Sequence, residues 1–241
     1  MAVRAAKAPV LAFIEDHVTA FPGWAEAIVA AHAQGWKAIG GEVHTANPGV
    51  GVSDAIGLMN YWRWLPSARS GVHDLIVGHN AAYDRETLLG LGESMEVLLR
   101  CDPVLQWHLQ EQGIDLFLNP DIKIAHINET EISSILRGYF QWNRVFAPTR
   151  AEVFRWTMPK RMVWILLAPL IPPARILKQL FHLLRYRPAL LKRFVSSLYV
   201  QFLAHSAAAA GQVTGLVFGM GDAETAFLHY ELNQVRRVCR N

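Results

Sequence analysis

Cysteine is almost absent from this chain of 241 residues, which contains only Cys101 and Cys239. So few thiols exclude a disulfide framework and a cysteine-rich zinc site. The long apolar segment of a secretory signal peptide is also lacking at the start, because residues 1–7 are basic and rich in alanine. The sequence therefore predicts a protein that faces the cytosol.

Acidic side chains are missing from a long stretch of the C-terminal part. No aspartate or glutamate lies between Glu152 and Asp222, whereas nine lysines and arginines fall in that stretch. The first 152 residues carry seventeen of the twenty acids. A change in composition of this size indicates two functional regions, which we expect to be residues 1–150 and 151–241.

An uninterrupted apolar run long enough to cross a bilayer is also lacking. Residues 162–171 are very apolar but supply only about half of the length that a membrane span needs. Residues 194–221 carry no formal charge, yet they include Gln201, His205 and Gln212. Both segments could be spanning helices, interfacial helices or packed core helices.

Residues 175–185 have the pattern of a helix that lies on a membrane. Arg175, Lys178, His182 and Arg185 fall on one helical face, and aliphatic side chains fall opposite. Such basic amphipathic helices are typical of contacts with anionic lipid. We therefore expect residues 155–220 to contact an anionic membrane surface at the cytoplasmic face of the membrane, peripherally or through one or two membrane helices.

Nucleic acid is not expected as a partner of this basic stretch. Its lysines and arginines alternate with long aliphatic runs. Nucleic-acid surfaces instead surround basic residues with polar side chains and aromatic rings on which bases stack.

A group of polar residues follows the first apolar segment. Residues 8–14 have the length and composition of a buried strand, and they end abruptly at Glu15, Asp16 and His17, before a predicted helix at residues 25–34. Open α/β sheets bind ligands just beyond the carboxyl ends of their strands. Carboxylates and a histidine in that place could hold a metal ion or exchange protons. The alternative is a solvated turn whose acids cap the helix.

In the rest of the first 150 residues, predicted strands alternate with predicted helices, as in an α/β domain. Further strands are predicted at residues 36–45, 74–77, 115–118 and 122–127, the last two being joined by a turn at residues 119–121. Helices are predicted at residues 53–65, 85–91, 98–112 and 131–146.

Several short motifs of this region occur in a familiar order. After Glu15-Asp16-His17 come a strand with Gly40-Gly41, the segment Gly78-His79-Asn80, a helix that opens with Cys101-Asp102-Pro103, and Asn119-Pro120-Asp121 followed by His126. The series resembles the second half of a family 2 glycosyltransferase with the GT-A fold, over about residues 1–130. In the C-terminal region, residues 210–215 look like a glycine motif of some membrane-associated members.

The resemblance implies a fold class. The chain is expected to be α/β, with a partial GT-A domain, that is, a Rossmann-like mixed sheet with flanking helices, and then an α-helical, membrane-associated C-terminal region. The nucleotide-binding half that opens the family's domain is not found before residue 8. We therefore expect this chain alone to bind a sugar nucleotide only weakly.

The resemblance also implies a metal site. Glu15, Asp16 and His17 stand where the family has its Asp-x-Asp signature, and His126 stands where some GT-A enzymes have a histidine that reaches back toward the metal ion. The expected cofactor is a divalent cation, Mn²⁺ or Mg²⁺, and a histidine ligand is better tolerated by Mn²⁺.

Asp102 is the predicted catalytic base, because it corresponds to the second acid of the family's Glu-Asp pair. The first acid is replaced here by Cys101, and the arginine further along the helix is replaced by His108. Taken singly, Asp102 could equally be a helix cap, and His126 a core histidine. The residues expected near the donor sugar and the acceptor are Gly78, His79, Asn80, Arg85 and Trp107.

These assignments together imply an activity. The expected reaction is the transfer of a sugar from a UDP-sugar or GDP-sugar to a glycan, a lipid-linked acceptor or another cell-envelope acceptor, with inversion at the anomeric carbon and help from a metal ion. The alternative is a truncated or degenerate glycosyltransferase-like protein that is a non-catalytic, membrane-associated partner. The replacement of the first acid by Cys101 favours that alternative.

Overall fold

A computed structural model describes residues 2–233 of the chain. Contacts divide the chain into two compact units. The first, called here the sheet unit, comprises Met1–His44 and Arg63–His126, and the second, called the helical unit, comprises Thr45–Trp62 and Ile127–Asn241. The functional boundary predicted at residue 150 falls within a helix of the helical unit, and it stays a prediction.

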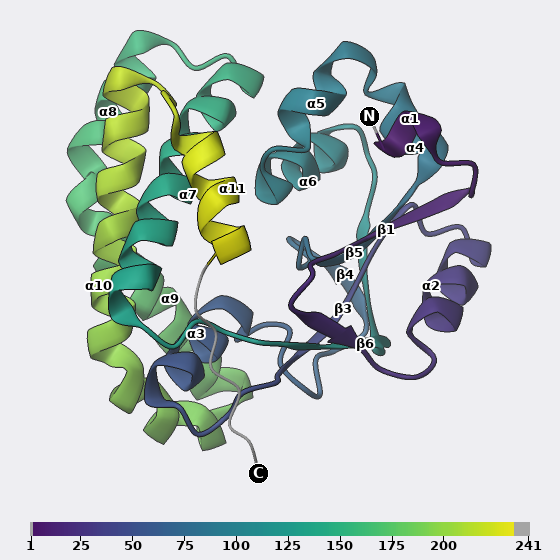
Figure 1. The fold of residues 1–241 in the computed structure, drawn as a ribbon, viewed down its shortest axis with the longest axis horizontal. Coiled ribbons are helices and arrows are strands. Elements are labelled where there is room, and N and C mark those ends of the chain that lie inside the picture. The colour runs from purple at the N-terminus through teal and green to yellow at the C-terminus, as the bar shows by residue number, and fades with distance from the viewer. Residues whose placement is uncertain (1, 234–241) are drawn as a thin grey trace. The chain divides into compact units, whose positions relative to one another are not determined.

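The sheet unit is built on six strands, so the expected mixed α/β class is confirmed at this level (Figure 1). The sheet has the order β1-β5-β3-β6-β2, and β4 also pairs with β6. Strand β5 runs antiparallel to both β1 and β3. The strands are β1 (Val10–Ile14), β2 (Val18–Ala20), β3 (Ala38–Thr45), β4 (Gly71–His73), β5 (Asn80–Asp84) and β6 (Leu116–His126).

Helices cover the sheet because its strands carry apolar side chains on both faces. Helix α2 (Trp24–Ala33) lays Ile28 and Ala31 against Ile39, Ala82 and Ile122 of the central strands. Ala82 and Tyr83 are neighbours in β5, so they point to opposite faces. The hydroxyl of Tyr83 accepts a hydrogen bond from Gln106 of α6 (Asp102–Glu111), and α6 therefore belongs to the other face.

The remaining helices of the sheet unit are short. They are α1 (Ala2–Ala5), α4 (Arg85–Gly90), a 3₁₀ turn at Gly92–Ser94 and α5 (Met95–Leu98).

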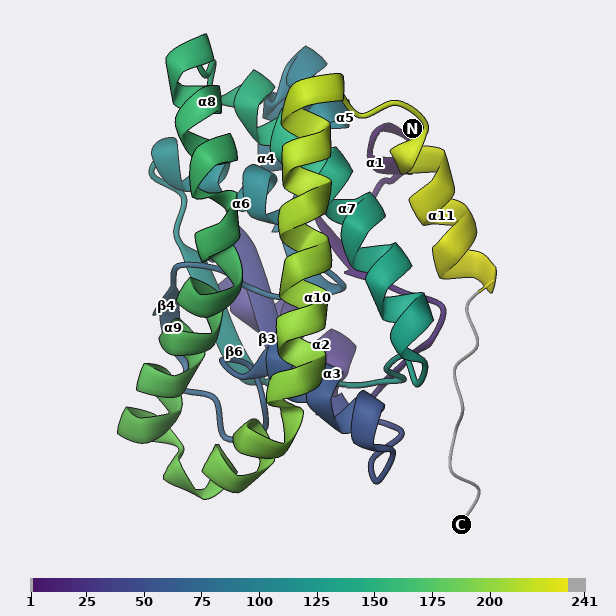
Figure 2. The same ribbon diagram turned by 90° about the vertical axis from the view of Figure 1, so that its left-hand side faces the viewer.

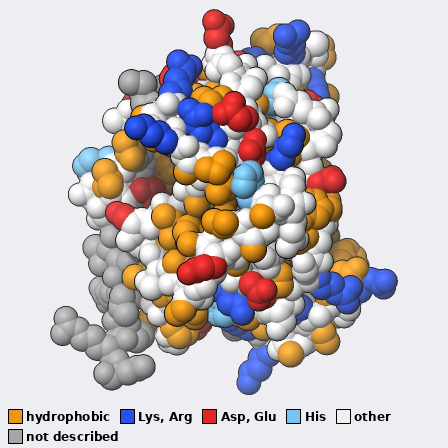
Figure 3. All heavy atoms as spheres, turned by 90° about the vertical axis from the view of Figure 1, so that its right-hand side faces the viewer, with side chains coloured by type: hydrophobic (Ala, Val, Ile, Leu, Met, Phe, Trp, Pro, Cys, Tyr) orange, Lys and Arg blue, Asp and Glu red, His pale blue; other side chains and the backbone are white. Residues whose placement is uncertain are grey.

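The surface on the side of the molecule shown in Figure 3 mixes hydrophobic, acidic and basic side chains. Such a mixed surface is ordinary for a folded domain in water.

The helical unit confirms the expected long helical C-terminal region (Figure 2). Helix α10 lies beside α7 and α9 over much of its length, and it also contacts α3. Its elements are α3 (Gly51–Tyr61), α7 (Ile132–Val153), α8 (Met158–Leu167), a 3₁₀ turn at Ala168–Leu170, α9 (Ile171–Tyr186), a 3₁₀ turn at Pro188–Leu190, α10 (Leu191–Phe218) and α11 (Ala223–Asn233).

Two glycines let α10 approach α7 closely. A Cβ atom added to Gly211 would lie 2.3 Å from the carbonyl oxygen of Phe140, and one added to Gly215 would lie 2.5 Å from that of Arg144. Small residues four positions apart allow helix backbones to meet in this way. The glycine motif seen in the sequence is thus a packing contact in the structure.

One helical segment of the described residues, Met158–Tyr186, is long and apolar enough to cross a membrane. It comprises α8, the following 3₁₀ turn and α9. In its most apolar window only 17% of the residues are buried inside the protein. This observation makes membrane association possible.

Candidate functional site

The pairing of β2 with β6 brings the polar strand tip next to His126. Residues Glu15, Asp16 and His17 form the connection between β1 and β2. Val18, the first residue of β2, lies directly opposite His126, the last residue of β6. The backbone therefore places His17 and His126 side by side, although they are far apart in sequence.

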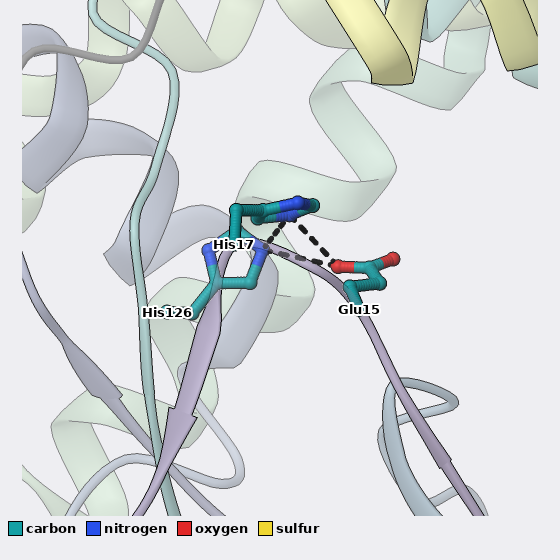
Figure 4. Close-up of side chains that lie close together, drawn as sticks. All are labelled: Glu15, His17 and His126. Carbon is teal, nitrogen blue, oxygen red and sulfur yellow. Dashed lines mark hydrogen bonds and ion pairs between the residues drawn. The ribbon is translucent and has the colours of Figure 1, made fainter.

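Three of these side chains point at one another (Figure 4). The Nε2 atoms of His17 and His126 lie 3.0 Å apart. One carboxylate oxygen of Glu15, Oε2, lies 2.9 Å from Nε2 of His17 and 3.3 Å from Nε2 of His126. Two imidazole nitrogens and a carboxylate oxygen at such distances need a proton or a cation between them, since each carries a lone pair.

The arrangement fits a divalent metal ion. Bonds of about 2.0–2.2 Å from a metal to nitrogen and oxygen ligands put neighbouring ligand atoms roughly 3 Å apart. The three donor atoms lie within 4.8 Å of one another, and His126 is buried whereas the Glu15 side chain is 39% exposed. A mixed nitrogen and oxygen set suits Mn²⁺, Fe²⁺ or Zn²⁺ better than Mg²⁺, which prefers oxygen.

Two further residues support this cluster. The Nδ1 atom of His17 hydrogen-bonds to Oδ1 of Asp16 at 2.8 Å, which fixes the imidazole so that its Nε2 faces Glu15. Nδ1 of His79, a residue predicted to contact substrate, lies 3.5 Å from Oε2 of Glu15. Burial raises the pKa of Glu15, but the interactions with His79, His126 and His17 outweigh it and leave that pKa well below its ordinary value.

The predicted base, Asp102, lines the same cavity as Glu15 of the cluster. A cavity of about 530 Å³ is lined by α1, by β1 and by the four residues Glu15, Gly78, His79 and Asp102. Asp102 is the first residue of α6 and is reached by solvent. The protein that surrounds its carboxylate, and then the negative charge of Glu15, raise the pKa of Asp102 to about 6. That value suits a group that must accept a proton near neutral pH.

Gly78 lies directly against the predicted base. A Cβ atom added to Gly78 would lie 1.7 Å from Oδ2 of Asp102. Since no side chain fits there, the glycine leaves the carboxylate open to the cavity.

The other predicted substrate residues have mainly structural contacts. The amide of Asn80 is buried; it donates to the carbonyl oxygens of Glu42 and Ile122 and accepts from Trp24. Arg85 donates to the carbonyl oxygen of Ala6 and pairs with Glu86. Trp107 is partly buried in α6. Their predicted roles toward a substrate stay predictions.

No protein-family model matches the sequence, and a comparison with curated proteins finds no significant match. The function therefore has to be inferred from the residues and their geometry.

Sequence reasoning missed one residue that shapes the site. Gln106 of α6 is fully buried; it accepts a hydrogen bond from the backbone N–H of Ile76 and donates one to the carbonyl oxygen of the same residue. These two bonds hold the segment that leads to Gly78 and His79. A glutamine three positions after a helix-opening proline gives no warning of this role, because glutamine is ordinary on a helix surface.

Proposed function

We propose that the protein is a glycosyltransferase that moves a sugar from a UDP-sugar or GDP-sugar to a lipid-linked or other cell-envelope acceptor, with a divalent metal ion and inversion at the anomeric carbon. One observation carries the proposal: the Glu15, His17 and His126 cluster and the Asp102 carboxylate belong to the same unit, and Glu15 and Asp102 line one cavity. The order of the motifs, which resembles family 2 glycosyltransferases, supports it.

Asp102 has the properties of the base in such a reaction. Its carboxylate takes the proton from the acceptor hydroxyl while that oxygen forms a bond to the anomeric carbon. The bond between the anomeric carbon and the diphosphate oxygen breaks, and the nucleoside diphosphate leaves with the electron pair. A pKa of about 6 keeps Asp102 largely ionised at neutral pH and able to accept this proton.

Glu15, His17 and His126 would hold the cation, and Asp16 would orient His17. A divalent ion in this place supplies positive charge that stabilises the departing diphosphate. His79 lines the cavity together with Glu15, and its Nδ1 is close to the Glu15 carboxylate. It is therefore suited to contact the diphosphate or the donor sugar.

We infer the cytoplasmic face of a membrane as the location, because lipid-linked acceptors reside in membranes and the acid-free stretch between Glu152 and Asp222 is basic. The apolar segment Met158–Tyr186 supports the same location.

A transfer assay tests the proposal. The full chain is incubated with millimolar radiolabelled UDP-sugars and GDP-sugars, MnCl₂ and a membrane lipid extract. The proposal predicts a labelled lipid product that disappears with EDTA and with Asp102→Asn. Labelling that is unchanged in Asp102→Asn, or no product from any donor, would contradict it.

A second candidate is a non-catalytic partner with the same fold, located at the membrane. The observation that favours it is Cys101, which is 1% exposed and stands where the family has its first acid. Failure of every donor in the transfer assay, together with retained membrane binding, would support this candidate.

A further inference from the structure

The helical unit exposes a band of large apolar side chains on consecutive helices. On α8 and the turn after it, the exposed residues, some of them adjacent pairs, recur every three or four positions, so they lie on one side of the helix. The most exposed is Leu166, at 72%. We call the following set the α8 stripe: Met158, Met162, Val163, Leu166, Leu167 and Leu170.

Helix α9 continues this exposure with a narrower stripe. Leu177, Phe181 and Leu184 are exposed along it, and the exposed basic residues Lys178 and Arg185 flank them. Many large apolar side chains exposed on consecutive helices of a folded protein mark a place where something else binds.

A cationic and aromatic cluster lies at the start of the α8 stripe. The guanidinium carbon of Arg150 lies 4.3 Å from the ring centroids of both Trp156 and Trp164. Lys160 lies 5.0 Å from the ring of Trp156, and the two tryptophan rings stack at 5.5 Å. Trp156 is only 8% exposed, so its ring packs against Arg150 inside the protein, whereas Lys160 is exposed at the surface.

Arg150 of this cluster and Arg161 of α8 have hydrogen-bond donors without a partner among the described residues. Within residues 2–233, Nε and Nη2 of Arg150 and Nε of Arg161 are buried and have no hydrogen-bond partner. The sequence offers no acid between Glu152 and Asp222 that could pair with them. Phosphate oxygens are the acceptors that best suit a guanidinium group.

We propose that the α8 stripe docks into the surface of a membrane that contains anionic phospholipids, with Lys160 and Arg161 binding the lipid phosphates. This inference deepens the membrane location given under the proposed function, by naming the side chains and the lipid chemistry. It does not depend on the transfer reaction.

An anionic bilayer suits this face better than a second copy of the chain. Two copies meeting through the stripe would bring two basic surfaces together, and neither has an acid between Glu152 and Asp222. Like charges at such a contact repel. A bilayer with anionic lipid supplies both the apolar phase and the negative charge.

The stripe is suited to lie in the plane of the interface. Helix α8 has ten residues, which span about 15 Å, or half of a bilayer's hydrocarbon core. Prolines 172 and 173 open α9, and Arg175 and Lys178 follow within the apolar segment. Charged residues at the centre of a bilayer are costly. An in-plane helix keeps them at the head groups instead.

Vesicle sedimentation tests the proposal with the full chain, without donor or metal. The probes are vesicles of phosphatidylcholine alone and vesicles that also contain phosphatidylglycerol. We expect binding to the anionic vesicles, and a loss of about 10-fold or more in Leu166→Gln/Leu170→Gln, because two exposed leucines no longer transfer to the apolar phase. Lys160→Gln/Arg161→Gln is expected to lose the preference for anionic lipid.

The matched control is Leu228→Gln/Leu232→Gln on α11. These leucines have the same four-residue spacing and are similarly exposed, at 60% and 67% against 72% and 58% for Leu166 and Leu170. The control is expected to bind as the wild type does, and circular dichroism verifies that all variants are folded. Absence of binding to anionic vesicles, or an equal loss in the control, would overturn the proposal.

Two further outcomes would also overturn it. The first is a dimer of the wild type in sedimentation equilibrium without lipid, together with a monomeric Leu166→Gln/Leu170→Gln variant. This result would show that a second copy covers the stripe. The second is membrane-bound protein that alkaline carbonate does not extract. This result would show that the helix spans the membrane and does not lie in its plane. Vesicle binding uses no sugar, so its failure leaves the transfer reaction standing, and a failed transfer assay leaves this proposal standing.

Discussion

The charge of Glu15 acts on Asp102, and both residues line one cavity. The protein that surrounds its carboxylate, and then the charge of Glu15, raise the pKa of Asp102 to about 6, whereas an ordinary aspartate has a pKa of about 3.9. Because a base must be ionised to accept a proton, the transfer rate should rise with pH up to about 6 and then level off.

Carbon-13 NMR of the side-chain carboxyls measures this value directly. We expect a titration midpoint near 6 for the signal that is missing in Asp102→Asn, recorded in the presence of EDTA. Glu15→Gln should lower this midpoint, since it removes a negative charge while burial remains. A wild-type midpoint near 3.9 would show that the cavity does not perturb Asp102.

Substitution of His126 tests whether the cluster binds a metal ion. We expect His126→Ala to weaken Mn²⁺ binding by at least about 10-fold, because it removes a buried nitrogen donor. Electron paramagnetic resonance of free Mn²⁺ gives the affinity. His229→Ala, an exposed histidine on α11, is the control. Equal affinities for both variants would exclude the cluster as the metal site.

The sequence predicted the residues of this cluster better than their contacts. Glu15, Asp16 and His17 were recognised from an apolar segment that ends in polar residues. His126 was proposed only through the resemblance, because the register of β2 against β6 determines its position, and such a register cannot be derived from spacing. The contact of His79 with Glu15 depends on tertiary structure in the same way.

Among the predicted strands, one error arises where a side chain holds the backbone in place of the hydrogen bonds of a sheet. The strand predicted at residues 74–77 is wrong. The apolar segment around Ile76 is held by the side chain of Gln106. The strand that follows it, β5, comprises Asn80–Asp84. The residues of β5 do not have a strand-like pattern, and β5 forms because it pairs with β1 and β3.

The turn predicted at residues 119–121 is also wrong, because β6 runs without a break from Leu116 to His126. Its partners explain how it tolerates Pro120. Besides its pairing with β3, β6 pairs with β4 through residues 116–118 and with β2 through residues 124–126, so the proline falls between the β4 and β2 ladders. A proline that lacks an N–H donor is accepted where no ladder bond is needed.

The close approach of α10 and α7 gives a test of helix packing. Gly211→Ala should destabilise the helical unit by about 1–3 kcal/mol, because the new methyl group meets the carbonyl oxygen of Phe140. Gly51→Ala is the matched control, since nothing lies within 4 Å of a Cβ atom there and alanine favours a helix. Urea unfolding measures both. A stability gain in Gly211→Ala would contradict the close contact.

His205 on α10 makes the helical unit sensitive to acid. Burial, and then the charge of Arg175, lower the pKa of His205 to about 3. The unfolded chain, with an ordinary histidine pKa of about 6.5, binds this proton more readily, so stability falls as the pH drops below about 6.5. Between pH 7.5 and 5 the wild type should lose about 5 °C more in melting temperature than His205→Gln. Equal losses would show that His205 is not buried in its neutral form.

The whole chain combines two units with different chemistry. Composition showed the contrast between an acid-containing N-terminal part and a basic C-terminal part. It could not show that residues 45–62 belong with the helical unit, because α3 has no basic bias and is held by packing, with Ile56 and Met59 against Ile135 and Ala204. The site residues lie in the sheet unit and the proposed membrane contacts in the helical unit.

The proposed chemistry requires above all that Glu15, His17 and His126 hold a metal ion. The most direct measurement is anomalous X-ray diffraction from crystals of the full chain soaked in MnCl₂. We predict one strong manganese peak at about 2.0–2.3 Å from the Glu15 carboxylate and from Nε2 of both histidines. A well-ordered cluster with no manganese peak among these three side chains would contradict the account.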